Sequence, residues 1–256
     1  MNKVLSLTYV ELNRRVIMFR RYPLNFFISI LSSIFVLFGI TETADYLSSN
    51  GLSSTSVTTV VVGYFSWIFS LGLTSTVSED ISEESKLGCF EHIATSIYSL
   101  SMIYTVRMVI NVAYYLLGAL IPLCVFVFLY SLPIYFPQLF GIHIILFLLT
   151  GVGISFTIGA VAVYNKRISL GLSLVQLGII AIFFYPHELN SMLTNILPFA
   201  KVISIIKVEV LEPNLIVPIS NYAISFVNAL IYLALGLMLF NFSVNKCKKE
   251  GLLNEH

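Results

Sequence analysis

Few side chains in this chain could carry out chemistry, and they are not grouped as a catalytic or metal site requires. His92, His143 and His187 fall in different segments and His256 ends the sequence, so no metal-ligand spacing emerges. No G-x-x-x-x-G-K-[ST] sequence for binding nucleotide phosphates occurs. We therefore expect a protein that is not itself an enzyme and that holds no metal or cofactor of its own.

An intramembrane enzyme is the main alternative from another class. Glu83 and Glu84 resemble the paired glutamates in the E-E-x-x-x-R sequence of membrane proteases that process lipidated substrates, but Gly88 stands in the place of the Arg. Such catalysis needs acidic and histidine side chains that meet inside the membrane. The apolar runs of this sequence offer only His143 and the thiol of Cys124. The sequence therefore disfavours this alternative.

The elements that carry these residues are long apolar runs. Hydrophobic residues make up 57% of the 256 residues and charged residues 11%, far from the composition of a soluble domain. Six runs approach the roughly 20 residues that a helix needs to cross a bilayer. They are Leu24–Thr41, Val57–Val77, Met108–Tyr130, His143–Tyr164, Ile168–Pro186 and Tyr222–Ser243. We predict an all-α membrane protein with one six-span domain over 24–243, preceded by 1–23 and followed by a tail over 244–256.

Nearly all basic residues fall on one predicted side of the membrane. Six crossings place both termini on one side, and of the 14 Lys and Arg residues only Lys201 and Lys207 fall on the other. The positive-inside rule therefore predicts cytoplasmic termini, which we expect in a bacterial cytoplasmic membrane. Because the six runs contain no Asp, Glu, Lys or Arg, coupling to a proton or sodium gradient is poorly supported. Any transport would draw its energy from a separate subunit.

Residues 3–22 have the pattern of an amphipathic helix in the membrane interface. Apolar residues recur at four-three-four-three spacing on one face, with basic residues opposite. The apolar face consists of Leu5, Tyr9, Leu12, Val16 and Phe19, and the basic face includes Lys3, Arg14 and Arg21. Pro23 should end this helix where the chain enters the first span. A basic flank that only sets the topology is the alternative to a helix that also contacts a cytoplasmic partner.

The longest cytoplasmic connection, residues 78–107, opens with acidic residues and continues as a predicted short helix. The acidic residues are Glu79, Asp80, Glu83 and Glu84, and the apolar face of the helix is formed by Leu87, Phe90, Ala94 and Ile97. Acidic side chains in a first helical turn interact favourably with the helix dipole. Such a helix at the base of two spans either packs on the bilayer or docks in a groove of another protein.

This connection resembles part of a known family. Residues 84–96 resemble the E-R-x-x-G-T-L-E-x-L-x-x-S/T-P signature that follows the second span in type-2 ATP-binding-cassette exporter permeases, with Gly88 and Glu91 at the matching spacing and Phe90 at the apolar position. Cys89 replaces the usual Thr, and Ile97 stands where Pro is common. Residues 14–25, which read R-R-x-x-x-x-R-R-Y-P-L-N, also resemble the family's entrance to its first span. The overall layout is similar over essentially the full length.

The resemblance implies a dimer of six-span permeases, identical or paired with a sister chain, with two separate ATPase subunits that bind ATP and Mg. It implies export of a hydrophobic or amphipathic cargo such as a drug, peptide or lipid. Residues expected to couple the chain to the ATPase are Leu87, Gly88, Phe90, Glu91, Ala94 and Ile97, with Arg14 and Arg15 of the N-terminal helix. A membrane protein that binds and sequesters a peptide or lipid without transporting it, as an immunity protein would, remains the alternative.

Polar and aromatic residues on the second and fifth runs are candidates for a cargo pathway. They are Tyr64, Ser66, Trp67, Ser70, Gln176, Phe183 and Phe184. An ordinary bundle interior is the alternative for each of them. On the fourth run, Gly151, Ser155 and Gly159 recur at every fourth residue, a spacing that predicts close helix packing.

The connection before the last run, residues 187–221, is interrupted by prolines. Between two of them, five apolar residues share one helical face, and Lys201 and Ser204 lie elsewhere. The five are Phe199, Val202, Ile203, Ile206 and Val210. We favour a helix half-sunk in the outer interface. A strand over 206–210, in which Lys207 and Glu209 alternate with apolar residues, is the alternative.

Overall fold

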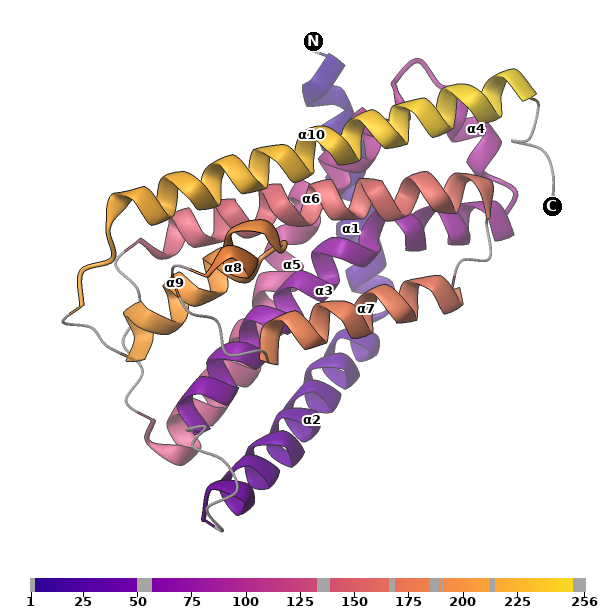
Figure 1. Ribbon diagram of the computed structural model, residues 1–256. Coiled ribbons are helices and arrows are strands. Elements are labelled where there is room, and N and C mark those ends of the chain that lie inside the picture. The colour runs from indigo at the N-terminus through magenta and orange to yellow at the C-terminus, as the bar shows by residue number, and fades with distance from the viewer. Residues whose placement is uncertain are drawn as a thin grey trace.

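The computed structural model describes residues 3–49, 57–132, 139–165, 169–184, 189, 191–211 and 215–250 (Figure 1). All regular secondary structure within these residues is α-helical. The helices are α1 (Lys3–Arg21), α2 (Pro23–Ser49), α3 (Val57–Lys86), α4 (Phe90–Ala94), α5 (Leu100–Tyr130), α6 (Phe140–Tyr164), α7 (Ser169–Phe184), α8 (Met192–Ile196), α9 (Ala200–Leu211) and α10 (Ile219–Glu250). The predicted all-α fold class is therefore confirmed.

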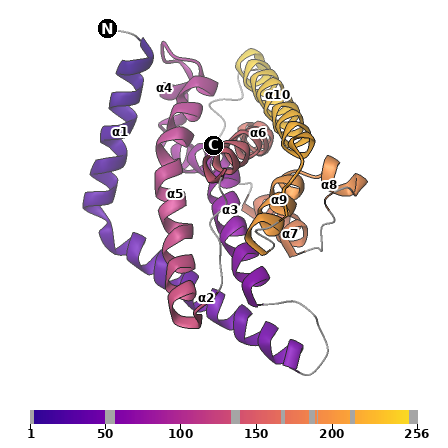
Figure 2. The ribbon, with the colours of Figure 1, turned by 90° about the vertical axis from the view of Figure 1, so that its left-hand side faces the viewer.

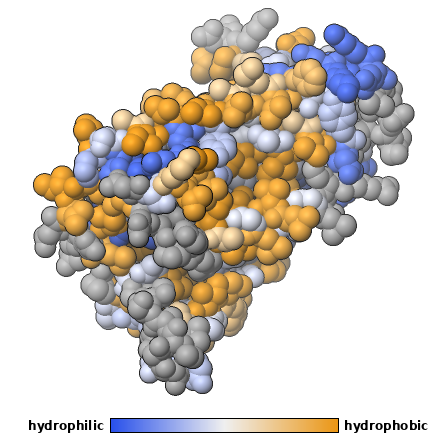
Figure 3. All heavy atoms as spheres, viewed as in Figure 1, coloured by the Kyte–Doolittle hydropathy of each residue, from blue (hydrophilic) through white to orange (hydrophobic). Residues whose placement is uncertain are grey.

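Five of the described helices are long and apolar enough to cross a membrane: α2, α3, α5, α6 and α10. Helix α7 has 16 residues, and the remainder of the run predicted over 168–186 lies outside the described residues. Figure 3 shows the face of the molecule on which α10 and α7 lie. Hydrophobic residues are spread over this face, and hydrophilic residues gather at the C-terminal end of α10. The protein is thus membrane-like, with five spanning helices by length and composition, and the sixth crossing stays a prediction.

Several spans extend beyond their predicted ends. Helix α3 continues past residue 77 to Lys86, and α5 begins at Leu100 rather than at residue 108. Helix α2 continues to Ser49, and α10 runs on through residues 244–250 of the predicted tail. The prediction ended each helix where charged residues begin, but a charged side chain does not break a helix when it finds a partner or faces water. The predicted connection over 78–107 is correspondingly shorter.

Small residues bring α6 against α3, as the spacing on the fourth run predicted, and against α10 through Gly153, which that spacing did not include. A Cβ atom added to Gly151 would lie 2.7 Å from Leu73 of α3. The closest approach is between Gly153 and Gly236 of α10, where a Cβ atom on Gly236 would lie 2.0 Å from the carbonyl oxygen of Gly153. No larger side chain fits between these two backbones, so α6 and α10 form the tightest helix pair described.

Helix α1 runs across the direction of α6 and α10 and packs along α5 (Figures 1 and 2). It ends at Arg21, two residues before Pro23, close to the predicted end. The side that meets the bundle includes Leu7 and Glu11, which are buried. The predicted apolar face is exposed on the surface, Tyr9 by 69%. Helix α1 therefore leaves an apolar stripe free, as an interface helix would.

Helix α9 confirms the helical alternative for the segment before α10 and excludes the strand over 206–210. The expectation of a half-sunk helix is wrong, because α9 packs into the protein. All five residues of its predicted apolar face are buried, and so are Lys201 and Ser204. Phe199, Phe183 and Phe147 form a buried aromatic group that fixes α9 to α7 and α6.

Candidate functional site

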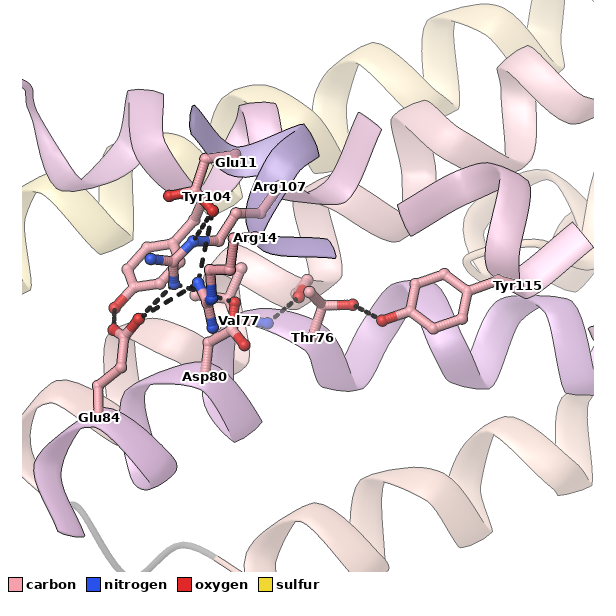
Figure 4. A network of polar contacts seen from close by, with 10 residues as sticks. Glu11, Arg14, Thr76, Val77, Asp80, Glu84, Tyr104, Arg107 and Tyr115 are labelled. Atoms are coloured by element: carbon pink, nitrogen blue, oxygen red, sulfur yellow. Dashed lines mark hydrogen bonds and ion pairs between the residues drawn. The ribbon is translucent and has the colours of Figure 1, made fainter. Parts of the chain in front are cut away.

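A buried group of charged side chains joins α1, α3 and α5 near the α4 end of the bundle (Figure 4). At its centre is Arg107 of α5, which is 7% exposed. Its Nε donates to Glu11 of α1 at 2.9 Å, and its Nη1 donates to Asp80 of α3 at 3.3 Å and to Glu84 of the same helix. One guanidinium group thus binds carboxylates from two other helices. We call Glu11, Arg14, Asp80, Glu84, Tyr104 and Arg107 the Arg107 cluster.

The outer members of the Arg107 cluster complete its hydrogen bonding. The hydroxyl of Tyr104 donates to the second oxygen of Glu84 at 2.8 Å. Arg14 of α1 approaches Glu11 at 3.4 Å and Glu84 at 3.9 Å. The carboxylates of Glu11, Asp80 and Glu84 therefore face the guanidinium groups of Arg107 and Arg14. A buried carboxylate is tolerated only when charges and donors compensate for lost hydration, and this arrangement supplies both.

The cluster explains why α3 continues through its acidic residues. Carboxylates near the C-terminal end of a helix oppose the helix dipole, the reverse of the first-turn placement that the sequence analysis expected. Arg107 offsets this effect for Asp80 and Glu84, which are one helical turn apart and face α5. A cavity of about 90 Å³ beside the cluster is lined by α1, α3 and α5. The base of α3 is therefore tied to the N-terminal helix.

The turn after α3 ends the helix in a defined way. Gly88 has φ of +69°, a backbone conformation that favours glycine. The N–H of Cys89 donates to the carbonyl of Glu84 at 2.8 Å, and the N–H of Gly88 donates to that of Ser85 at 3.1 Å. This pair of bonds is a Schellman motif. Gly88 thus has a structural reason to be glycine.

Helix α4 is shorter than the predicted coupling helix. Phe90 and Ala94 are each 2% exposed and pack with Ile81 and Tyr104, but the predicted stripe does not continue to its other two members. Leu87 precedes α4 and Ile97 follows it, and they are 75% and 83% exposed. The expectation of one continuous apolar face is wrong, because the Gly88 turn separates Leu87 from α4 and the helix ends at Ala94, before Ile97. The result is a short helix anchored by two residues, with apolar side chains exposed on either side and Glu91 exposed on it.

Arg14 and Arg15, predicted to contact an ATPase, both contact this chain. Arg14 belongs to the Arg107 cluster. The guanidinium group of Arg15 lies 3.9 Å from the ring centroid of Tyr114 on α5, a cation–π contact. Arg14 is still 42% exposed, so one side of it stays open to a partner. Their role in coupling stays a prediction.

Two of the predicted pathway residues line a cavity of about 360 Å³ between α2, α3 and α5. The hydroxyl of Tyr64 donates to the carbonyl of Ser33 at 2.8 Å, and Trp67 packs edge-on against Tyr64. The indole nitrogen of Trp67 is buried and has no hydrogen-bond partner among the described residues. The remaining lining is aromatic, aliphatic, glycine and serine, without a charged side chain. We call this space the Trp67 cavity.

Four of the other predicted pathway residues do not line the Trp67 cavity. Ser66 and Ser70 are fully buried and donate to carbonyls of their own helix, at 3.0 Å to Val62 and 2.8 Å to Trp67. Phe183 lies in the aromatic group below α9, and Gln176 is half-buried on α7. The side chain of Phe184 lies outside what the structure describes. The structure therefore does not bring the six described candidates together within one chain, and the role of all seven in a pathway stays a prediction.

The comparisons with known proteins identify no relative. No family model, no curated protein and no solved structure matches this chain. What can be said of its class comes from its own residues: an all-helical, membrane-like protein with a charged cluster at the base of α3 and α5.

Proposed function

We propose that this chain is the membrane-spanning permease subunit of an ATP-driven exporter. It moves a hydrophobic or amphipathic cargo, such as a drug, peptide or lipid, out across a bacterial cytoplasmic membrane. In this proposal the chain crosses the membrane six times with both termini in the cytoplasm. It pairs with a second permease, the same or a sister chain, and two ATPase subunits bind ATP and Mg.

The observation that carries the proposal is the placement of α4. It lies between two spanning helices, and Phe90 and Ala94 fix its inner face. Next to it, the Arg107 cluster joins α3 and α5 to α1. A partner that pushes on the exposed side of α4 therefore acts on three helices at once. A local movement is passed on to whole helices only if the residues between them are tightly packed and do not deform.

The Trp67 cavity supports the cargo class. Its walls combine aromatic rings with serine hydroxyls and carry no charge, which suits an uncharged amphipathic molecule. A charged cargo would lose its hydration in such a space without gaining a partner of opposite charge. Cargo selection by this cavity predicts that Trp67→Ala changes which cargo is exported more than it changes basal ATP hydrolysis.

Association with an ATPase subunit tests the proposal directly. The double variant Leu87→Ser, Ile97→Ser removes exposed apolar groups beside α4 and leaves the buried Phe90 in place. It should weaken binding of a purified ATP-binding-cassette subunit and reduce cargo-stimulated hydrolysis. A matched control is Ile216→Ser, which removes a 91% exposed apolar group near the start of α10. If the purified chain binds no ATPase subunit in mild detergent and still binds peptide or lipid, a sequestering protein is the better description.

A further inference from the structure

A second buried group of titratable side chains lies at the other end of the molecule, where α9 packs against α6 and α10 (Figure 1). His143 comes from the first turn of α6, Glu209 from the last turn of α9 and Tyr222 from the first turn of α10. Three helices thus bring an imidazole, a carboxyl and a phenol together. The exporter proposal uses none of them.

The geometry leaves two facing atoms without partners. Nε2 of His143 lies 3.5 Å from Oε2 of Glu209. The hydroxyl of Tyr222 donates to the other carboxyl oxygen, Oε1. The His143 side chain is 1% exposed and that of Glu209 is 16% exposed. Nε2 and Oε2 are buried and make no hydrogen bond to any described residue. Buried polar atoms of this kind normally have partners, so their isolation needs an explanation.

Among the described residues, the other charged groups of α9 are already engaged. Helix α9 also carries Lys201 and Lys207, whose ammonium groups donate to the backbone carbonyls of Leu189 and of Phe183 on α7. The part of α3 that faces α6, residues 57–78, has no acidic or basic side chain, and α6 has none besides His143. Among the phenols on the neighbouring helices, Tyr64 of α3 bonds Ser33, Tyr130 of α5 bonds Glu42 of α2, and Tyr232 of α10 bonds the carbonyl of Ile196.

We infer that His143 and Glu209 form a proton-binding site that holds α9 against α6. One proton between Nε2 and Oε2 satisfies both atoms, whether the imidazolium donates to the carboxylate or the carboxyl donates to the neutral imidazole. Without this proton the carboxylate stays buried with Tyr222 as its donor on the other oxygen, and contact with His143 no longer stabilises α9. The ligand is therefore a proton from the aqueous phase at this end of the bundle.

The sign of the pH effect follows from the same contacts. Burial raises the pKa of the Glu209 carboxyl above its ordinary value, so the closed arrangement retains a proton that an exposed glutamate would release. The closed arrangement then binds the proton more tightly than an open one. The closed arrangement is therefore more stable than the open one at low pH, and this difference in free energy is lost as the pH rises through the apparent pKa of the pair. Each pKa unit between the two arrangements changes their ratio by about tenfold.

Hydrogen exchange of the α9 amides tests the site without an ATPase or a cargo, so its failure is separable from failure of the exporter proposal. The full chain in lipid nanodiscs is compared between about pH 5 and pH 8.5, with rates corrected for the intrinsic pH dependence of exchange. Protection of residues 200–211 should be lost progressively as the pH rises through the apparent pKa of the pair. Protection of α6 around the Gly153 contact should not follow it.

Two variants and a control test whether the pH dependence of α9 protection comes from His143 and Glu209. His143→Gln and Glu209→Gln should each flatten the pH dependence of α9 protection, because neither side chain can then share the proton. His92→Gln, which changes a histidine in α4 at the opposite end, should keep the wild-type dependence. Infrared difference spectra give a separate readout, since the band that appears on acidification should shift in isotope-labelled histidine or disappear in Glu209→Gln. Protection that is independent of pH, or that rises with pH, would overturn the inference.

Discussion

The two buried charge groups at opposite ends of the bundle differ in how completely they are paired. In the Arg107 cluster, each carboxylate has a guanidinium group within 3.3 Å and Glu84 also has a phenol. At the α9 end, His143 and Glu209 face each other with unpartnered atoms. A fully paired group acts as a structural tie. An incompletely paired one changes with the uptake of a single proton.

Arg107→Ala should have the largest effect of any change at either end. Removing the guanidinium leaves three carboxylates near one another with only Arg14 to compensate, a situation that costs about 3–5 kcal/mol of unfolding free energy. Titration with a denaturing detergent measures that free energy. Lys246→Ala is the matched control, because its pair with Glu250 is half-exposed and contributes about 0–1 kcal/mol. Equal losses in the two variants would contradict the structural role of the cluster.

Tyr104→Phe should come next, because it deletes one donor and leaves the volume unchanged. The phenol donates to a buried, charged carboxylate, so its loss costs roughly 1.5–3 kcal/mol. Tyr232→Phe is the comparison at the other end, where the phenol donates to the neutral carbonyl of Ile196 and the loss is about 0.5–1.5 kcal/mol. The same unfolding measurement applies to both. A larger loss in Tyr232→Phe would argue against a charged Glu84.

The fold class could be predicted from the sequence, because long apolar runs identify spanning helices by composition alone. The ends of α3 and α5 could not be predicted. One apolar run ends before Asp80 and the next begins after Arg107, and hydropathy does not show that these two side chains contact each other. The sequence did contain a signal for this pairing. Arg107 is the only Lys or Arg between Lys86 and Lys166, and it directly precedes an apolar run.

The α9 end was harder to predict for a different reason. The pattern of α9 identified a helix and its apolar face, but an apolar face packs equally well against lipid and protein. The burial of Lys201 shows that protein surrounds it, which periodicity cannot reveal. The pairing of His143 with Glu209 depends on α6 and α9 being neighbours, and neither residue has a sequence motif around it. Only the folded arrangement of the helices brings them together.

Glu209→Gln should sharpen the contrast in pH response. Because burial raises the pKa of this carboxyl, its ionisation destabilises the folded chain as the pH rises from its ordinary value of about 4.5 through the raised value. The wild-type chain should lose stability over this window, by about 1.4 kcal/mol for each pH unit between the ordinary and the raised pKa, and the variant should not. Thermal unfolding midpoints between about pH 4 and pH 8 measure the difference. A parallel loss in the variant would assign the pH dependence to other groups.

Arg14→Gln should change the unfolding free energy least, because Arg14 lies at the solvent-exposed edge of the Arg107 cluster. Arg14 approaches two of the carboxylates that Arg107 binds, at 3.4 and 3.9 Å, but it is 42% exposed. Water and salt screen its interactions, so we expect a loss of at most about 1 kcal/mol that decreases further in high salt. The unfolding free energy at two salt concentrations measures this. A loss as large as that of Arg107→Ala would mean that the cluster depends equally on both guanidinium groups. The exposed Arg14 would then stabilise the packing of α1 on the bundle as much as the buried contact of Glu11 with Arg107 does.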